Sequence, residues 1–410
     1  MLERLQSTYR EFPRAFWILA LAAFIDRLGA TIIFPFFALY VTQRFGVGMT
    51  EAGVLIAIFS ISGFVGSLIG GVLTDRFGRR SLVIFGLVAS ALSSLIMGFV
   101  NELVVFYAVA VFAGLLSDMA GPAHGAMVAD LLPEEKRAEG FGVLRVAANL
   151  AWIIGPSIGG LLAATSFLLL FVLDAVSSLT TAAIVYRFIP ETMPAPAEGE
   201  ESGESGDLLA TLRGYGVVLK DYVFMFYVTA CTVMGLGYTQ IYSTLSVYLR
   251  DVHGVSAGGF GLLLSLNAAV VVVFQFWLTR RLTGRAPMLL MAAGSLLYMV
   301  GLGMYGLVAV YALFVVAMVL ITFGEMIVVP QGNSLAANFA PEAMRGRYMA
   351  LFGLSWTISG ALGPWGAGLI MDNGNPDWIW YLAAILSAVA AGGFLLLYFV
   401  TRKETAVNQL

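Results

Sequence analysis

The sequence predicts an all-α membrane protein with 12 transmembrane helices in two six-helix lobes. Three observations predict this class. Hydrophobic residues make up 60% of the chain, and charged residues only 11%, whereas soluble domains carry about 25% charged residues. Apolar segments of about 18 or more residues, long enough to cross a membrane as helices, recur along the whole length. Because these apolar runs are continuous and do not alternate as short strands, a transmembrane barrel is excluded.

The predicted spans follow one another along the chain with short connections. No cleavable signal peptide is expected, because the first apolar run is too long for one and lacks a small-residue cleavage site. Cys231 is the single cysteine, and the two histidines, His124 and His253, have no metal-ligand spacing, so we expect no disulfide, no metal and no cofactor. The spans are 15–41, 52–73, 82–100, 103–131, 139–164, 166–188, 222–249, 258–279, 286–306, 308–339, 345–371 and 378–400.

The distribution of basic residues predicts the orientation of the spans. With 12 spans, both termini share one side, and eighteen of the 22 Lys and Arg residues fall on that side. Only Arg44 and Arg250 fall on the other. The positive-inside rule therefore predicts a multi-pass protein of the cytoplasmic (inner) membrane with both termini in the cytoplasm.

A central polar segment divides the chain into halves. The run PETMPAPAEGEESGESGD, residues 190–207, is rich in Pro, Gly, Ser and acid, and such a composition cannot bury a core. We expect a mobile tether there, with a regulatory segment as the alternative. The predicted organisation is an N-terminal lobe at 1–189, a cytoplasmic linker at 190–220 and a C-terminal lobe at 221–410.

The two halves repeat a pattern of residues at a constant offset of 208 positions. Parallel six-helix repeats form two lobes with a substrate site between them near the middle of the membrane, and rocking of one lobe against the other opens that site alternately to each side. The matching features are Pro122 and Pro330, PEEKR (133–137) and PEAMR (341–345), Gly155-Pro156 and Gly363-Pro364, and Gly160 and Gly368.

The turn between the second and third spans carries the motif GGVLTDRFGRRS, residues 70–81. Its glycines permit close helix packing and a tight turn, its arginines anchor the cytoplasmic face, and Asp75 can accept hydrogen bonds from a helix N-terminus of the other lobe. The alternative is a simple basic loop. The residues assigned to this predicted conformational latch are Gly71, Asp75, Arg76, Gly78, Arg79 and Arg80.

This motif resembles the signature of the major facilitator superfamily, and the repeat of six spans extends the resemblance over essentially the whole chain. The resemblance implies the major facilitator fold and a latch in which Asp75 and the arginines hold the outward-open state. In the second copy, LTRRLTGRAP (278–287), Arg280 stands where Asp75 aligns, so the latch is expected on one side only.

The fifth span contains NLAWIIGPSIGG, residues 149–160. A proline within a helix removes a backbone hydrogen bond and can bend it. The segment resembles the antiporter motif of the superfamily, although Ala151 stands where a glycine is usual, and this favours an exporter over an uptake symporter. The alternative is a packing kink without bearing on direction. The motif residues are Gly155, Pro156, Gly159 and Gly160.

Six charged residues lie in the interior of the predicted spans, away from the span ends: Asp26, Arg27, Asp118, Arg145, Asp174 and Glu325. At about 1.5 Å per helical residue, three of the acids lie near mid-membrane. Burial disfavours the charged form of an acid, so such groups can load and release protons. We therefore predict proton coupling through Glu325, Asp118 and Asp26.

Alternatives remain open at several of these positions. Asp26 can simply be neutralised by Arg145 or Arg27, which are the predicted charge partners. Asp174 lies nearer the outer end of its span, where a structural cap or water contact is favoured. Asp130 lies close to PEEKR and is expected in the latch network. Glu325 has no basic residue in its own span to neutralise it.

The stretches GEMIVVPQGNSLAANFAPE and MVADLLPEEKR resemble those of multidrug–proton antiporters of the superfamily. The resemblance implies that Glu325 takes part in proton coupling and contacts cationic drugs, and it marks Asp130 as a protonation site. The arginine of many drug antiporters in the fourth span is Ala110 here, and Arg145 is a candidate to replace it.

The predicted substrate cavity is aromatic and amide-rich, as is typical of sites for diverse apolar compounds. Ordinary membrane packing is the alternative for these side chains. The cavity residues are Glu325, Asn149, Trp152, Gln240, Tyr242, Gln331, Asn333 and Trp356.

These observations predict a proton-coupled antiporter that exports small amphipathic or cationic compounds, such as drugs, by alternating access. The alternative in the same fold is an exporter of one defined metabolite, a sugar or an amino acid. An enzyme is not predicted, since the chain shows no nucleophile–base pair, metal cluster or phosphate-cradling glycine–lysine loop. The expected partners are a small-molecule substrate, protons and membrane lipid, without nucleic acid, and the expected state is a monomer.

Overall fold

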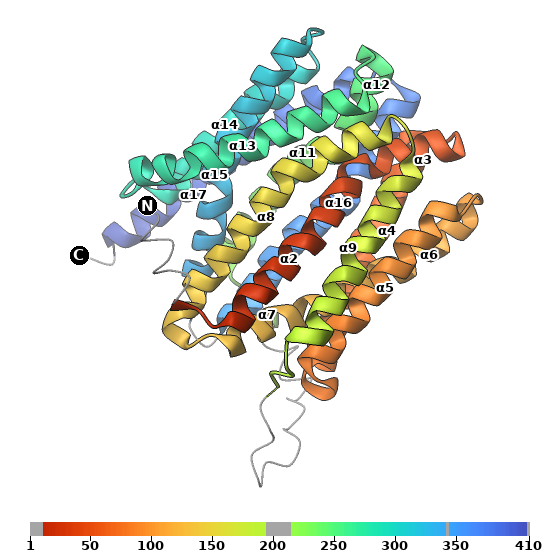
Figure 1. Cartoon of the computed structure of the whole chain (residues 1–410). Helices are drawn as coiled ribbons and strands as arrows, with labels where there is room; N and C mark the ends of the chain where they lie inside the picture. The colour runs from red at the N-terminus through yellow and green to blue at the C-terminus, as the bar shows by residue number, and fades with distance from the viewer. Residues whose placement is uncertain (1–10, 194–214, 342–343, 408–410) are drawn as a thin grey trace. The chain divides into compact units, whose positions relative to one another are not determined.

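The computed structural model describes residues 11–193, 215–341 and 344–407, and leaves out the side chains of residues 75, 138 and 402–407. Within these ranges every regular element is a helix (Figure 1), so the predicted all-α class is confirmed. Most of the predicted polar tether, 190–207, lies outside the described residues.

The first half of the chain forms six membrane-length helical stretches, two of which are interrupted. The first stretch changes to a 3₁₀ turn at Phe34–Phe36, where Pro35 lacks the backbone N–H that an α-helix requires. The elements are α2 (Arg14–Ile33), η1 (Phe34–Phe36), α3 (Phe37–Phe45), α4 (Met49–Phe77), α5 (Arg79–Phe99), α6 (Leu103–Asp118), α7 (Ala120–Leu131), α8 (Glu134–Ala163) and α9 (Phe167–Phe188).

The second half repeats this series, with its own 3₁₀ interruption in the first stretch. Its elements are α11 (Tyr222–Tyr238), η2 (Thr239–Ile241), α12 (Leu245–His253), α13 (Ala257–Leu282), α14 (Pro287–Tyr305), α15 (Tyr311–Phe339), α16 (Arg345–Asn373) and α17 (Asp377–Val407).

Eleven helical stretches of the described chain are long and apolar enough to cross a membrane. The twelfth predicted span, 345–371, falls on α16, a helix of 29 residues that is not among the eleven. Gly, Ser, Thr and Trp residues dilute its apolar run, so its length, more than its hydropathy, identifies it. The helix exists where it was predicted.

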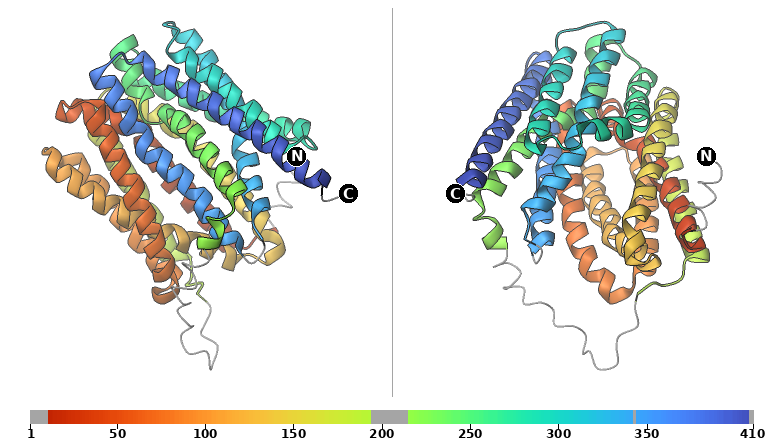
Figure 2. Two further views of the ribbon diagram at one scale, coloured as in Figure 1. Left: turned by 180° about the vertical axis from the view of Figure 1, so that it is seen from behind. Right: turned by 90° about the vertical axis from the view of Figure 1, so that its left-hand side faces the viewer.

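Internal contacts divide the chain into two compact units. Unit 1 comprises 1–47, 54–195 and 254–268, and unit 2 comprises 48–53, 196–253 and 269–410. In unit 1, α2 packs along α8 and α9, and α5 packs along α9, α6 and α7; in unit 2, α14 packs along α15 and α17, and α11 along α16 and α17 (Figure 2). Helices α4 and α13 each begin in one unit and continue in the other.

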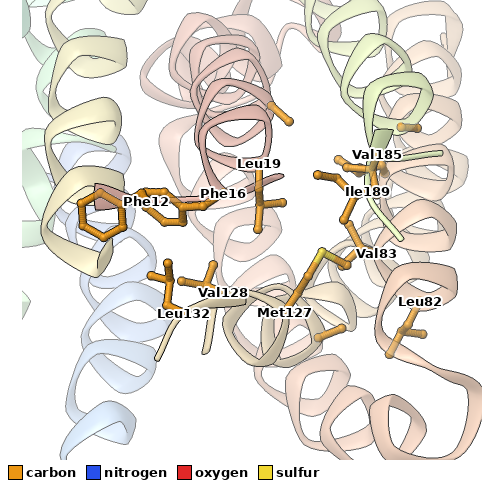
Figure 3. Packing of buried hydrophobic residues seen from close by; sticks show 14 residues of the cluster. Phe12, Phe16, Leu19, Leu82, Val83, Met127, Val128, Leu132, Val185 and Ile189 are labelled. Carbon is orange, nitrogen blue, oxygen red and sulfur yellow. The ribbon is translucent and has the colours of Figure 1, made fainter. Parts of the chain in front are cut away.

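An apolar cluster in unit 1 joins the start of α2 to α5, α7 and the end of α9. Phe12 and Phe16 lie beside Val128 and Leu132, while Met127 points toward Val83 (Figure 3). Phe16, Met127 and Val128 are completely buried. The cluster holds the ends of these helices together next to the turn that carries the GGVLTDRFGRRS motif.

Within unit 1, the Gly-Pro segment of α8 makes a very close crossing with the beginning of α13. A Cβ atom at Gly160 would lie 2.6 Å from the carbonyl oxygen of Ala257, and one at Gly261 would strike the carbonyl oxygen of Pro156. The hydroxyls of Ser157 and Ser265 hydrogen-bond across the same crossing at 2.7 Å. Only glycine lets the two backbones approach so closely.

Unit 2 contains the second copy of this crossing, between α16 and the first turn of α4. A Cβ at Gly368 would lie 2.6 Å from the carbonyl oxygen of Met49, and one at Gly53 would lie 2.6 Å from that of Pro364. Each of these four positions is 208 residues from its counterpart in unit 1. The repeat found in the sequence is therefore also a repeat of backbone contacts.

One feature of this crossing is present in unit 2 alone. The Asp372 carboxylate accepts hydrogen bonds from the backbone N–H groups of Met49 (2.9 Å) and Thr50 (2.7 Å), at the N-terminus of α4. Those N–H groups have no partner within their own helix, and an anion is favoured at that end. The residue 208 positions earlier is Ala164, which cannot form such a cap.

Candidate functional site

The membrane acids of unit 1 contact hydroxyl groups of neighbouring helices. Asp26 of α2 accepts a hydrogen bond from the Ser178 hydroxyl of α9 at 3.1 Å. Asp174, four residues before Ser178, is only 6% exposed and accepts a hydrogen bond from the Ser94 hydroxyl of α5. A Cβ at Gly29 of α2 would lie 3.0 Å from Asp174 Oδ1. Asp174 thus makes a structural contact at the junction of three helices, which is one of the roles expected for it.

Arg27 is the basic residue whose charge acts on two of the membrane acids of unit 1. Its guanidinium interacts electrostatically with Asp26 on the same helix, with Asp118 at the end of α6 and with His124 of α7. Arg145 of α8 has an exposed side chain and takes part in none of the ion pairs found among the described residues. His124 was not among the predicted site residues, because it has no ligand spacing in the sequence.

In unit 2 the Glu325 side chain lies among phenol groups. Glu325, in the middle of α15, interacts electrostatically with Tyr238, Tyr242 and Tyr298. The hydroxyls of Tyr238 and Tyr242 hydrogen-bond each other at 3.1 Å, and the ring of Tyr238 lies 5.1 Å from that of Tyr298. Trp356 of α16 lies at the edge of this group. The residue is 38% exposed, and its ring lies 6.0 Å from the Tyr238 ring.

The glycine that precedes Glu325 explains why the phenols come so close. A Cβ at Gly324 would lie 2.9 Å from the Gly294 carbonyl oxygen and 2.9 Å from the nearest ring carbon of Tyr298. Helices α14 and α15 therefore cross at nearly minimal separation, with Tyr298 directly over Gly324. This crossing brings a half-buried carboxylate and a set of aromatic rings to one place.

The other predicted cavity residues are distributed over both units. Asn149 and Trp152 lie on α8 in unit 1, and the Trp152 ring packs edge-on to Phe34 at 6.4 Å. Gln331 and Asn333 lie on α15 in unit 2, where the Asn333 amide donates to the Val329 carbonyl at 3.0 Å.

Gln240 lines a cavity that does not include Glu325 or its tyrosine neighbours. Its amide donates to the Leu236 carbonyl (2.8 Å), and its oxygen accepts from the Thr244 hydroxyl (2.6 Å), so its polar atoms are satisfied by its own helical segment. The side chain borders a cavity of about 220 Å³ whose other walls are Leu, Ile, Ala and Gly of α11, α16 and α17. This environment favours the packing alternative for Gln240.

The basic turn after α4 is braced within unit 1. Arg79 forms an ion pair with Asp130 of α7, in agreement with the expectation that Asp130 belongs to the latch network. Arg80 donates to the Tyr186 carbonyl of α9 and stacks 5.1 Å from the Tyr186 ring. Arg76 is exposed beside Phe77. The side chain of Asp75 lies outside the described residues.

Three glycines of the motif have different surroundings. Gly78 has a φ of 87°, which only glycine adopts readily, and ends the turn before α5. Gly71 has no atom within 4 Å of the place of a Cβ, whereas one at Gly70 would strike the Met119 backbone. Gly70 is therefore the glycine at the helix crossing in this conformation.

The sequence prediction missed the acid that caps this turn. Glu191 accepts hydrogen bonds from the backbone N–H groups of Arg79 (2.9 Å), Arg80 (3.2 Å), Thr192 (3.0 Å) and Met193 (3.1 Å). Its slight burial favours the neutral form, but these four donors outweigh that effect and lower the pKa of Glu191 below its ordinary value. Glu191 is the second residue of the polar linker, directly after Pro190, so only the fold reveals its partner.

The glycines of NLAWIIGPSIGG pack against two helices. A Cβ at Gly155 would strike Thr31 of α2, and one at Gly159 would lie 2.7 Å from the Phe36 ring. Pro156 and Gly160 face α13, as described above. Among the described residues no group of three or more His, Cys, Asp and Glu side chains could hold a metal ion.

Comparison with known proteins agrees with this architecture. The family model described as Major Facilitator Superfamily matches residues 19–364 and 290–410. The chain is 27% identical to "Na(+), Li(+), K(+)/H(+) antiporter" of Planococcus maritimus, over 97% of this chain and 99% of that protein. It is 24% identical to "Multidrug resistance protein MdtH" of Cronobacter sakazakii, over 91% of this chain and 90% of that protein.

Solved structures of transporters have the same fold. A POT family transporter in complex with 5-aminolevulinic acid superposes with a TM-score of 0.78 at 17% identity, over 94% of this chain and 96% of that chain. The nucleoside transporter NupG superposes with a TM-score of 0.77 at 13% identity, covering 94% and 99%. These relatives are transporters and not enzymes. The chain therefore belongs to the major facilitator superfamily and is a multi-pass membrane transporter.

Proposed function

We propose that the protein is a proton-coupled antiporter that exports small amphipathic or cationic compounds, drugs among them, by alternating access. The observation that carries this proposal is the position of Glu325, a half-buried carboxylate on an apolar helix beside three tyrosines and Trp356. Aromatic faces and a carboxylate are together the groups that attract an organic cation.

Exchange follows if Glu325 holds either a proton or a cation, but not both. A carboxylate within a membrane is costly while charged, so a proton or a bound cation stabilises it. Proton binding from outside would displace the exported cation, and the protonated carrier would then open inward and release the proton as the next cation binds. Asp26, Asp118 and Asp130, with Arg27 and Arg145 as charge partners, are proposed to share proton coupling in unit 1.

The topology belongs to the same proposal. We propose the cytoplasmic membrane as the location, both termini in the cytoplasm, and lobes at 1–189 and 221–410 joined by the linker 190–220. The distribution of Lys and Arg supports the orientation. The motif GGVLTDRFGRRS with Asp75 would act as the latch, and a monomer would suffice for transport.

A second candidate substrate is a monovalent metal cation. The relative from Planococcus maritimus is named as an antiporter of Na⁺, Li⁺ and K⁺ against H⁺, and unit 1 contains carboxylate and hydroxyl oxygens suited to hard cations. Organic cations remain the first choice, since the neighbours of Glu325 are aromatic.

Transport in reconstituted vesicles tests the proposal. Full-length protein in vesicles with an acid interior should accumulate ethidium, and Glu325→Gln should reduce this accumulation at least about tenfold, because the amide cannot exchange a proton. The matched control is Glu135→Gln, an exposed acid at the start of α8, which should behave as wild type. Accumulation of Na⁺ but not ethidium would select the second candidate, and equal ethidium transport by Glu325→Gln would reject Glu325 as the coupling acid.

A further inference from the structure

Tyr298 of α14 has a buried hydroxyl that the described part of the chain leaves without a hydrogen-bond partner. The residue is only 1% exposed, and its hydroxyl makes no hydrogen bond to any described group. Buried polar groups are almost always paired, because an unpaired one loses its bonds to water without replacement. A matched residue on the same helix behaves differently, since the Tyr305 hydroxyl donates to the Phe314 carbonyl at 3.4 Å.

The backbone around Tyr298 fixes its ring against the residue before Glu325. Gly294, Tyr298 and Gly301 form one stripe of α14, and the two glycines pack on α15 at Val328 and Ile321. The Tyr298 ring lies over Gly324, where a Cβ would come within 2.9 Å of it. The ring therefore cannot swing away without separating the two helices.

Few titratable groups face the Tyr298 hydroxyl. Those that interact with it electrostatically are Glu325 of α15, Tyr238 of α11 and Tyr242, which follows η2. Tyr242 is already hydrogen-bonded to Tyr238. Helices α11, α14 and α15 contain no Lys, Arg or His, and the neighbour from α16 is the indole of Trp356. On α17, the Tyr and charged residues lie near its two ends, at 377, 381, 398 and beyond.

We propose that Tyr298 is a positioning residue for Glu325, whose carboxylate accepts a hydrogen bond from the Tyr298 hydroxyl whenever it carries no proton. The buried hydroxyl is then paired in the proton-free state and released when Glu325 takes up a proton. A hydrogen bond to the charged form of an acid favours that form, so Tyr298 sets the pH at which Glu325 exchanges its proton. This inference rests on the proposed role of Glu325 as the coupling acid.

The test is the pH dependence of ethidium binding to purified full-length protein, in wild type, Tyr298→Phe and Tyr305→Phe. Removing the Tyr298 hydroxyl while keeping the ring should move the half-maximal pH upward by about one unit, because the carboxylate then keeps its proton to higher pH. Maximal binding should change less than about twofold, since the aromatic surface is retained. Tyr305→Phe, which loses a hydroxyl from the same helix, should leave the midpoint unchanged.

Two outcomes separate this inference from the proposed function. If wild type and Glu325→Gln transport ethidium equally, the proposed role of Glu325 as the coupling acid fails, and the role of Tyr298 fails with it. If Glu325→Gln abolishes exchange but Tyr298→Phe keeps the wild-type midpoint, or Tyr305→Phe shifts it equally, only the inference about Tyr298 is overturned. A double variant tests whether Tyr298 acts through Glu325. In the Glu325→Gln background, Tyr298→Phe should not change the pH dependence further.

Discussion

The two units share their backbone crossings but differ in the chemistry of their buried polar groups. In unit 1, carboxylates meet hydroxyls or Arg27 within the same unit: Asp26 with Ser178, and Asp174 with Ser94. In unit 2, Glu325 lies among phenols, on a helix without any base. The repeat has thus kept the glycines that set the architecture, while the charged groups have diverged.

This difference indicates separate tasks for the two units. In unit 1, Arg27 interacts with Asp26 and Asp118, and hydroxyl groups hydrogen-bond Asp26 and Asp174. Helices α11, α14 and α15 contain no arginine or lysine, so in the proposed cycle a proton or a cationic substrate would bring positive charge to Glu325. A carboxylate in these surroundings is suited to exchanging a proton for a cationic substrate.

The largest expected effect concerns the shared architecture. Gly53→Leu and Gly261→Leu, at equivalent places in the two copies, should each abolish folded protein or destabilise it by several kcal/mol, because both side chains would strike a proline carbonyl. Thermal unfolding in detergent measures the loss, and Gly392→Leu, where a Cβ meets no atom within 4 Å, is the control. If the protein tolerates one substitution but not the other, the two crossings are not equivalent.

A smaller effect is expected from the paired acids of unit 1. Ser94→Ala leaves the buried Asp174 carboxylate without its hydroxyl donor and should cost about 1–3 kcal/mol of unfolding free energy. Ser60→Ala is the control, since that hydroxyl donates only within its own helix, to Ile56. An unchanged stability of Ser94→Ala would contradict the structural role given to Asp174.

The cap that exists only in unit 2 offers a sharper comparison. Asp372→Ala removes the acceptor of two N–H groups at the start of α4 and should destabilise the protein by about 1 kcal/mol. Asp372→Asn keeps an acceptor oxygen and should lose less. If both variants unfold at the wild-type temperature, the carboxylate does not stabilise the helix start.

The smallest effect is the pH dependence of the Glu191 cap. The pKa of Glu191 is lowered in the folded state, so the stabilisation that its carboxylate gives to the folded protein is complete above the ordinary pKa of 4.5. That stabilisation is lost as the pH falls through the lower pKa of the folded state. Glu191→Gln should therefore flatten the fall in unfolding temperature between about pH 5 and pH 3. A wild-type slope in this variant would show that other acids cause the fall.

The architecture was largely predictable from the sequence. Apolar runs predicted the helices, and the offset of 208 residues predicted a structural repeat of the two halves. The contacts between Gly53 and Pro364 and between Gly261 and Pro156 recur at the same offset, but only the structure reveals them. Hydropathy was less informative at α16, where small and polar residues line a helix of full length. Length and repeat position identify that helix better than composition.

The surroundings of each charge were harder to predict. Tyr238 and Tyr298 look like ordinary aromatic residues in apolar helices, and only the close crossing at Gly324 brings them to Glu325. Arg27 was predicted as a charge partner of Asp26, but its charge acts on Asp118 and His124 as well. Such groupings depend on how three helices meet, which no single helix pattern encodes.

Proton movement coupled to substrate tests the central claim most directly. Ethidium added to vesicles containing the full-length protein should drive counter-movement of protons, detected by a pH-sensitive dye in the lumen. We expect this signal in wild type and Glu135→Gln, and its loss in Glu325→Gln. A full signal from Glu325→Gln would contradict the assignment of exchange to the single carboxylate of α15.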